Sequence, residues 1–187
     1  MKLLLTTNAS TRQSSVGISR WLIVMCILVL PSAALAANPA ETRAEKLFKT
    51  AGELVQRTHY LEALDQLNEA KDLLDKAGLE RTRLYGDVLF SLAETKIKGR
   101  LHQGFPASYV KSALKDVQAA NKLREKLPDI LPQQLAAGYY LEGFIHKKFF
   151  MRKETALSCF VKAVNIDPGS TAAKRELSEL VAGTRKK

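Results

Sequence analysis

Three segments of this chain repeat one arrangement of small and large apolar residues, and this arrangement most strongly limits the folds open to it. The clearest copy carries Ala156, Phe160 and Ala163, with Pro168 five positions further on. On one helix face, two alanines leave room for a neighbouring helix, and the larger residue between them fills the remaining space. Proline cannot continue a helix, so Pro168 ends the segment. The pattern predicts closely packed helix pairs.

The same spacing occurs twice upstream, with alanines flanking a leucine or a valine. These residues are Ala63, Leu67, Ala70, Ala113, Val117 and Ala120. Apolar periodicity is helical throughout the rest of the chain, and no stretch alternates with a period of two. We expect helices at about 41–57, 59–76, 80–98, 106–126, 133–150 and 153–166, and a seventh after Ser170.

Glycine and proline residues mark the expected helix boundaries. Gly78 predicts a helix end, since glycine takes the left-handed conformation at little cost. Residues 99–106 are expected to form a loop, with Pro106 in the first turn of the next helix. Pro128 and Pro132 mark the break after the fourth helix.

The segment from Ala156 to Pro168 resembles the second half of a tetratricopeptide repeat (TPR), and residues 41–184 resemble that family over most of their length. The resemblance implies an all-α domain of antiparallel hairpins stacked as a short solenoid, with about three hairpins and a C-terminal capping helix. In the cap, Lys174, Arg175 and Glu176, together with Glu179, are expected to lie opposite the leucines.

The chain also departs from the family pattern. The leading alanines of successive copies are 50 and 43 residues apart, against a family period of about 34. No tryptophan occupies the first-helix signature position, where Leu47 and Tyr140 lie, and Gly143 is one position away from the signature glycine. The first and third repeats therefore read as degenerate and the second only as TPR-like. Another antiparallel helical stack fits these spacings nearly as well.

Residues 1–36 are expected to be a cleavable signal peptide. Residues 1–20 carry three bases and no acid, and an apolar run from Trp21 to Leu30 follows. This run is shorter than the about 20 residues that a membrane span needs. Ala34 and Ala36 suit cleavage before Ala37, which predicts a Sec-type route to a periplasmic or secreted location. An uncleaved anchor is the alternative, and a mitochondrial presequence is disfavoured by the unbroken apolar run.

A lipoprotein signal is rejected because Met25 precedes Cys26, where a small residue is required. Beyond the signal we expect a linker at 37–40, a TPR-like domain at 41–184 and a basic tail at 185–187. Cleavage lowers the formal net charge from +10 to +7 and leaves Cys159 as the only cysteine, so the domain has no internal disulfide. We expect Cys159 to be a buried apolar residue instead of a reactive thiol.

No motif that usually marks catalysis occurs in the sequence, and nothing singles out a pair of catalytic carboxylates. His59, His102 and His146 form no metal-type pair, and no nucleophile elbow, P-loop or dinucleotide-binding motif occurs. We therefore expect no enzymatic activity and no cofactor or metal.

A partner site is expected where the resemblance places the concave groove, on the first helix of each hairpin. A cluster of aromatic and basic residues at 139–153 adds to this expectation, because such a groove suits an acidic peptide or a terminal carboxylate. The expected groove residues are Phe48, Gln56, Leu141, Ile145, Lys148, Phe149 and Arg152.

The sequence favours an exported protein–protein interaction module, an adaptor or scaffold in a bacterial cell envelope. The alternatives are a helical small-ligand-binding or enzyme-associated subunit and an envelope assembly factor that self-associates. The basic excess fits solubility, or attraction to an anionic membrane or envelope polymer. Nucleic acid is disfavoured, because acids and bases mix along every helix. Membrane association is not indicated after cleavage, and the oligomeric state stays open.

Overall fold

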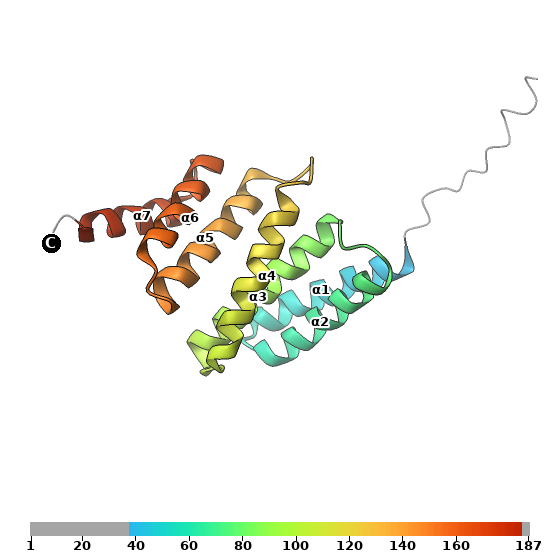
Figure 1. Ribbon diagram of the computed structural model, residues 1–187. Helices are drawn as coiled ribbons and strands as arrows, with labels where there is room; N and C mark the ends of the chain where they lie inside the picture. Colours follow the sequence, from blue (N-terminus) through green and yellow to red (C-terminus); the bar gives the residue numbers. More distant parts are fainter. Residues whose placement is uncertain (1–37, 185–187) are drawn as a thin grey trace, which may run out of the picture. The chain divides into compact units, whose positions relative to one another are not determined.

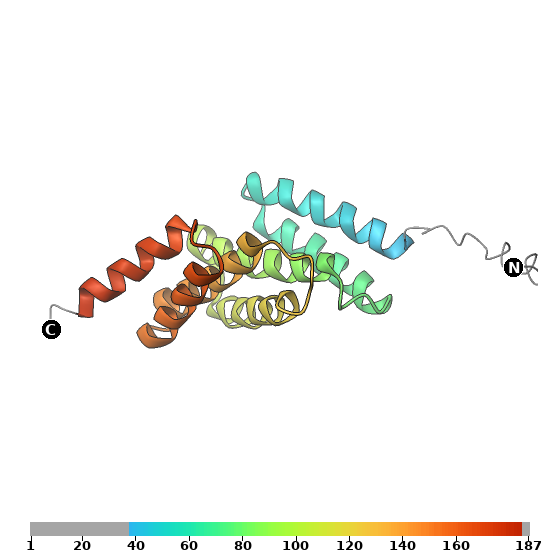
Figure 2. The same cartoon turned by 90° about the horizontal axis from the view of Figure 1, so that it is seen from above.

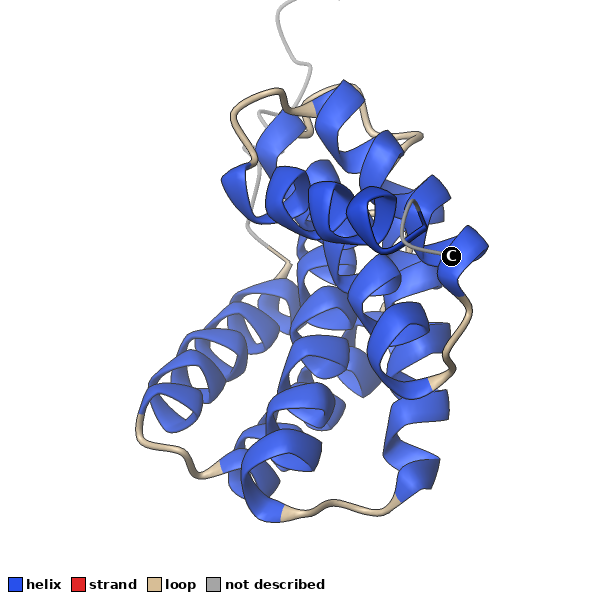
Figure 3. Ribbon diagram, turned by 90° about the vertical axis from the view of Figure 1, so that its left-hand side faces the viewer, coloured by secondary structure: helices blue, strands red, loops and turns tan. Residues whose placement is uncertain are grey.

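The computed structural model describes residues 38–184, so the expected signal peptide and basic tail lie outside the described residues. All regular elements in this part of the chain are helices, and none is a strand (Figure 3). They are α1 Pro39–Gln56, α2 Tyr60–Lys76, α3 Arg83–Gln103, α4 Ala107–Arg124, α5 Pro132–Phe149, α6 Lys153–Ile166 and α7 Thr171–Thr184. The all-α prediction is confirmed.

The helices form stacked hairpins, as predicted. The closest packing joins α1 to α2, α3 to α4 and α5 to α6, and short turns make each pair antiparallel. Neighbouring hairpins pack through α2 with α3 and through α4 with α5, and α7 follows on α6 (Figure 1). Within residues 38–184, α1 and α7 lie at opposite ends of this array (Figure 2).

Besides the α2–α3 and α4–α5 contacts, odd-numbered helices of neighbouring hairpins also touch one another. Helix α3 touches both α1 and α5, whereas no comparable contact joins α2 to α4 or α4 to α6 in the described part of the chain. The odd helices therefore line one side of the stack and the even helices the other, which is the arrangement of a helical solenoid.

The repeated alanine pattern forms the core. All six alanines of the three copies are 0% exposed, and the larger residues between them, Leu67, Val117 and Phe160, are at most 1% exposed. In the third hairpin, Gly143 of α5 helps this close approach, because a Cβ there would lie 2.8 Å from the Phe160 ring. Pro168 is exposed and follows the end of α6.

Polar caps and left-handed residues set the helix ends. The Asn38 side chain accepts a hydrogen bond from Ala40 N at 3.0 Å at the start of α1, and Thr82 accepts from Tyr85 N at 3.3 Å at the start of α3. Gly78 takes φ +69° after α2, at the boundary that the sequence predicted.

The expected loop at 99–106 is wrong over most of its length. Helix α3 continues to Gln103 and ends at Gly104, where φ is +70°. Gly99 lies inside the helix, and a Cβ there would lie 2.3 Å from the Phe105 ring. Glycine at 99 therefore admits Phe105, which is 6% exposed, into the core between the first two hairpins.

The turns of the first and third hairpins match each other. Thr58 and Met151 both have positive φ, at 64° and 56°, and each lies two residues before the following helix. The second hairpin instead turns through Gly104, Phe105 and Pro106. The first and third hairpins therefore share a turn geometry that the second hairpin lacks.

Helix α7 is linked to the third hairpin by one lysine that pairs with two glutamates. Lys147 Nζ of α5 lies 2.5 Å from Glu176 and 2.8 Å from Glu179. Glu176 is 8% exposed, so the expectation that it lies on the outer face of the cap is wrong.

Across residues 38–184, no helix combines the length and the apolar character that crossing a bilayer requires.

Candidate interaction surfaces

Two of the expected partner-binding residues line one groove between α1 and α3. Phe48 and Gln56 of α1 face Ser91, Glu94 and other α3 residues across a hollow of about 300 Å³. Its lining includes Thr95, which is 2% exposed. A Cβ at Gly52 would meet nothing within 4 Å, so this glycine leaves the groove open.

A second hollow continues the groove toward the start of both helices. It measures about 450 Å³, and it shares Phe48 and Lys49 with the first hollow. Thr42 of α1 and Arg83 of α3 line its far part. The two hollows make one open channel along α1 and α3, with a partly buried aromatic side chain at its middle.

Charges in this channel are balanced and paired within helices. Lys49 lies 2.8 Å from Glu45, and Lys98 lies 2.9 Å from Glu94. Arg83 lies 3.9 Å from Asp87. Because both signs alternate along the walls, the channel offers hydrogen-bonding groups to an extended backbone without strongly favouring an acidic segment.

Leu141 and Ile145 lie in the core and do not line an open groove. They are 8% and 0% exposed, and they pack with Ala93 and Ile97 of α3 and Val110 of α4. The cause is the position of α5 in the stack. Residues of α3 and α4 in the second hairpin cover this face of α5.

Lys148, Phe149 and Arg152 lie near the turn between α5 and α6. Lys148 is exposed and has no ion-pair partner in the described range, and it lines a hollow of about 380 Å³ with Met151, which is 78% exposed. Phe149 packs edge-on against Phe144, with ring centroids 6.3 Å apart. The Arg152 guanidinium lies 5.4 Å from the centre of the Phe150 ring. These residues form a basic and apolar corner separate from the α1–α3 channel.

A buried polar layer joins the second and third hairpins. Arg124 of α4 is 3% exposed, and its Nη2 donates to Asp87 Oδ1 of α3 at 2.6 Å. Its Nη1 donates to the Gln134 carbonyl of α5 at 3.0 Å, and its guanidinium lies 4.8 Å from the centre of the Phe90 ring. One side chain therefore links three helices.

Asn121 extends this layer by one turn of α4. Its Nδ2 donates to Glu142 of α5 at 3.0 Å, and Gln118 donates to the other oxygen of Glu142 at 2.9 Å. A Cβ at Gly138 would lie 1.9 Å from Asn121 Oδ1, so only glycine admits the amide there. The layer fixes the third hairpin against the second, which is a structural task.

His146 is the last member of the layer and is 3% exposed. Burial lowers the pKa of its imidazole, while Glu142 opposes this shift and Arg152 adds to it. Its Nδ1 has no hydrogen-bond partner within the described residues, and its ring lies 6.0 Å from that of Phe150. The neutral form is thus the form that the fold favours.

The sequence did not predict this polar layer, because arginine and asparagine side chains on a helix normally face water. Gly138 is the residue that could have predicted the layer. A glycine inside a helix costs stability, so its presence indicates that another group packs closely against the helix backbone there. Within residues 38–184, no three histidine, cysteine, aspartate or glutamate side chains lie together as metal ligands would.

Neither the protein-family models nor the curated proteins compared with this sequence give a match. The interaction surfaces therefore rest on the geometry of this chain alone.

Proposed function

We propose that this protein is an exported, non-enzymatic adaptor of a bacterial cell envelope, built as a degenerate TPR array. It binds a peptide segment of another protein along the channel between α1 and α3. The observation that carries this proposal is the pair of hollows that meet at Phe48 and Lys49 and run along both helices.

The form of the channel supports a peptide over a small molecule. Small-ligand sites are enclosed and mostly apolar, with a few converging polar groups. This channel is open, it extends along two helices, and its walls alternate acids, bases and amides around one aromatic side chain. An extended chain fits such a surface, because its backbone can use the polar walls while one side chain packs on Phe48.

Exchange of charge on the channel wall tests the binding surface. Lys49→Glu reverses an exposed charge in the channel, and Lys46→Glu makes the same change on α1 away from it. The full-length chain and both variants, expressed in a bacterial envelope, are used to purify bound proteins. We expect a partner that the parent chain and Lys46→Glu retain and that Lys49→Glu loses. Recovery of the same proteins by all three would contradict the proposal.

Export has its own test, which does not depend on the partner. The amino terminus of the protein recovered from the envelope is sequenced. We expect it to begin at Ala37, whereas a terminus at Met1 in an envelope fraction would show that the leader is kept as an anchor.

A further inference from the structure

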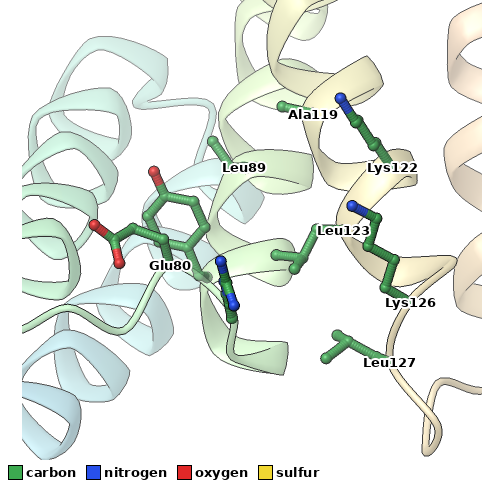
Figure 4. A pocket seen from close by; sticks show the side chains of 9 residues that line it. Glu80, Leu89, Ala119, Lys122, Leu123, Lys126 and Leu127 are labelled. Carbon is green, nitrogen blue, oxygen red and sulfur yellow. The ribbon is translucent and has the colours of Figure 1, made fainter.

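A hollow of about 560 Å³ lies between α3 and α4 and is not part of the α1–α3 channel. Its apolar floor consists of Leu89 from α3, Leu123 from α4 and Leu127 from the following loop (Figure 4). Leu89 is 5% exposed, so the hollow reaches into the core. Its volume falls within the about 300–1,000 Å³ of ligand-binding pockets.

The two hollowed surfaces lie on opposite sides of α3. At about 100° per residue, Tyr85 and Leu89 share one face of the helix, whereas Ser91, Glu94 and Lys98 share the opposite face. The first pair lines the α3–α4 hollow and the second set lines the channel. Occupation of one site therefore leaves the other accessible.

The rim of the hollow carries unpaired positive charge. Arg81, Lys122 and Lys126 line it, and none of their side chains has an ion pair or hydrogen bond to another residue within 38–184. Figure 4 shows Lys122 of α4 and Lys126 of the turn after it on one side of the hollow and Glu80 on the other. Elsewhere on the same two helices, Lys96 lies 2.5 Å from Asp116, so a lysine here readily finds an acidic partner where one is in reach.

The wall beside the rim is held in place by a neighbouring helix. The Lys71 ammonium of α2 lies 5.7 Å from the centre of the Tyr85 ring and 2.5 Å from Asp75. These contacts satisfy Lys71 and Asp75 locally, so neither of them neutralises the rim. The hollow thus combines a fixed aromatic wall, a leucine floor and three unpaired cations against one acid.

We propose that this hollow is a second binding site, which takes a short acidic segment of a partner protein with a leucine-type side chain. The apolar side chain packs on Leu89 and Leu123, and the neighbouring carboxylates lie between Lys122 and Lys126. Glu80 on the opposite rim disfavours a continuous anionic surface such as a membrane. A peptide avoids that conflict, because it presents its acids on one side and its backbone on the other.

Fluorescence anisotropy with a defined probe tests this site. The probe is a fluorescein-labelled ten-residue peptide of glutamate and leucine, and the protein is the full-length chain. Lys122→Glu/Lys126→Glu reverses two rim charges, and Lys111→Glu/Lys115→Glu makes the same change on the exposed start of α4. We expect the first double variant to bind at least about tenfold more weakly and the second to stay within about threefold of the parent chain. A peptide with glutamine in place of glutamate should lose binding to a similar extent.

The floor is tested separately with Leu127→Ser, which changes a loop residue and leaves both helices intact. We expect Leu127→Ser to bind the glutamate–leucine probe more weakly than the parent chain does. With a glutamate–serine probe, which has no leucine to pack on the floor, the variant and the parent chain should bind equally. Circular dichroism confirms that each variant is folded.

Several results would overturn the proposal. One is no binding of the probe by the parent chain, and another is equal loss in the two double variants, which would show a net-charge effect alone. Binding to phosphatidylglycerol vesicles that depends on Lys122 and Lys126, without peptide binding, would assign the hollow to a membrane. Self-association that Lys122→Glu/Lys126→Glu abolishes in light scattering would assign it to a second copy of the chain.

Discussion

Arg124 of α4 and Asp87 of α3 form a buried ion pair, with Nη2 and Oδ1 2.6 Å apart and side-chain exposures of 3% and 21%. The guanidinium also lies 4.8 Å from the centre of the Phe90 ring and donates to the Gln134 carbonyl of α5. Asp87 belongs to the same hairpin as Arg124 and balances its charge, whereas the Gln134 carbonyl belongs to the third hairpin. The Arg124 side chain therefore links the packing of the second hairpin to that of the third.

Removal of one partner should cost more than removal of both. Asp87→Ala leaves the Arg124 charge buried without its counterion, and we expect the free energy of unfolding to fall by about 3 kcal/mol. Asp87→Leu/Arg124→Met replaces both charges with apolar groups and should be less destabilising than the single change. Urea unfolding followed by circular dichroism measures both. Arg83→Ala is the control, since Arg83 is exposed and 3.9 Å from Asp87, and it should cost less than about 0.5 kcal/mol. A loss below about 1 kcal/mol for Asp87→Ala would contradict the role of the pair.

Two helical glycines should respond to alanine in opposite directions. Gly138→Ala places a Cβ 1.9 Å from Asn121 Oδ1, so the amide must move and the variant should be destabilised by about 1–3 kcal/mol. Gly52→Ala meets nothing within 4 Å, and it should stabilise the chain by about 0.5–1 kcal/mol through helix propensity. Thermal unfolding of both variants separates the two effects. A stabilised Gly138→Ala would show that Asn121 relaxes freely.

The buried imidazole of His146 should make the fold less stable in acid. Burial lowers its pKa in the folded chain, so below about pH 6.5 the unfolded chain binds more protons than the folded chain does. The free energy of unfolding should therefore decrease as the pH falls from about 6.5 through the lowered folded pKa.

His146→Leu removes this contribution. The difference in the free energy of unfolding between parent and variant, measured from pH 7.5 to 5, separates the effect of His146 from that of the carboxylates, which both proteins share. The variant should lose less stability over this range. Parallel curves would indicate that Glu142, which raises the pKa of His146, cancels the effect of burial.

The thiol of Cys159 should be slow to react in the folded chain. Burial raises its pKa to about 11, and the side chain is 7% exposed. At about pH 8 only about 0.1% would be thiolate, which is the reactive form. In a Cys26→Ser background, we expect labelling by a disulfide reagent to be at least about 100-fold slower in buffer than in urea. Similar rates would mean that the third hairpin opens readily.

The sequence predicted the hairpins because close helix packing needs alanine at fixed positions, and those positions repeat. It failed at Gly99, where glycine allows the Phe105 ring to approach the helix and does not break it. A glycine can either end a helix or let a side chain pack against it. Only the position of that side chain, here Phe105, tells the two cases apart.

The candidate site was predicted in part, and the reason lies in the stack. Gln56 and Phe149 end equivalent helices 93 positions apart, as do Thr58 and Met151 in the turns that follow. The same offset relates Phe48 to Leu141, yet Phe48 lines a channel and Leu141 is buried. Within residues 38–184, α5 has a hairpin before it and α1 does not, so the local sequence pattern cannot tell a helix at the end of the stack from one inside it.

Each hairpin of the array packs mainly on its neighbours: α2 meets α3, α4 meets α5, and α3 also touches α1 and α5. A small change of angle between the first and second hairpins therefore adds to one between the second and third. The two ends of the array, α1 and α7, can thus shift by more than any single interface does, while the packing inside each hairpin stays intact.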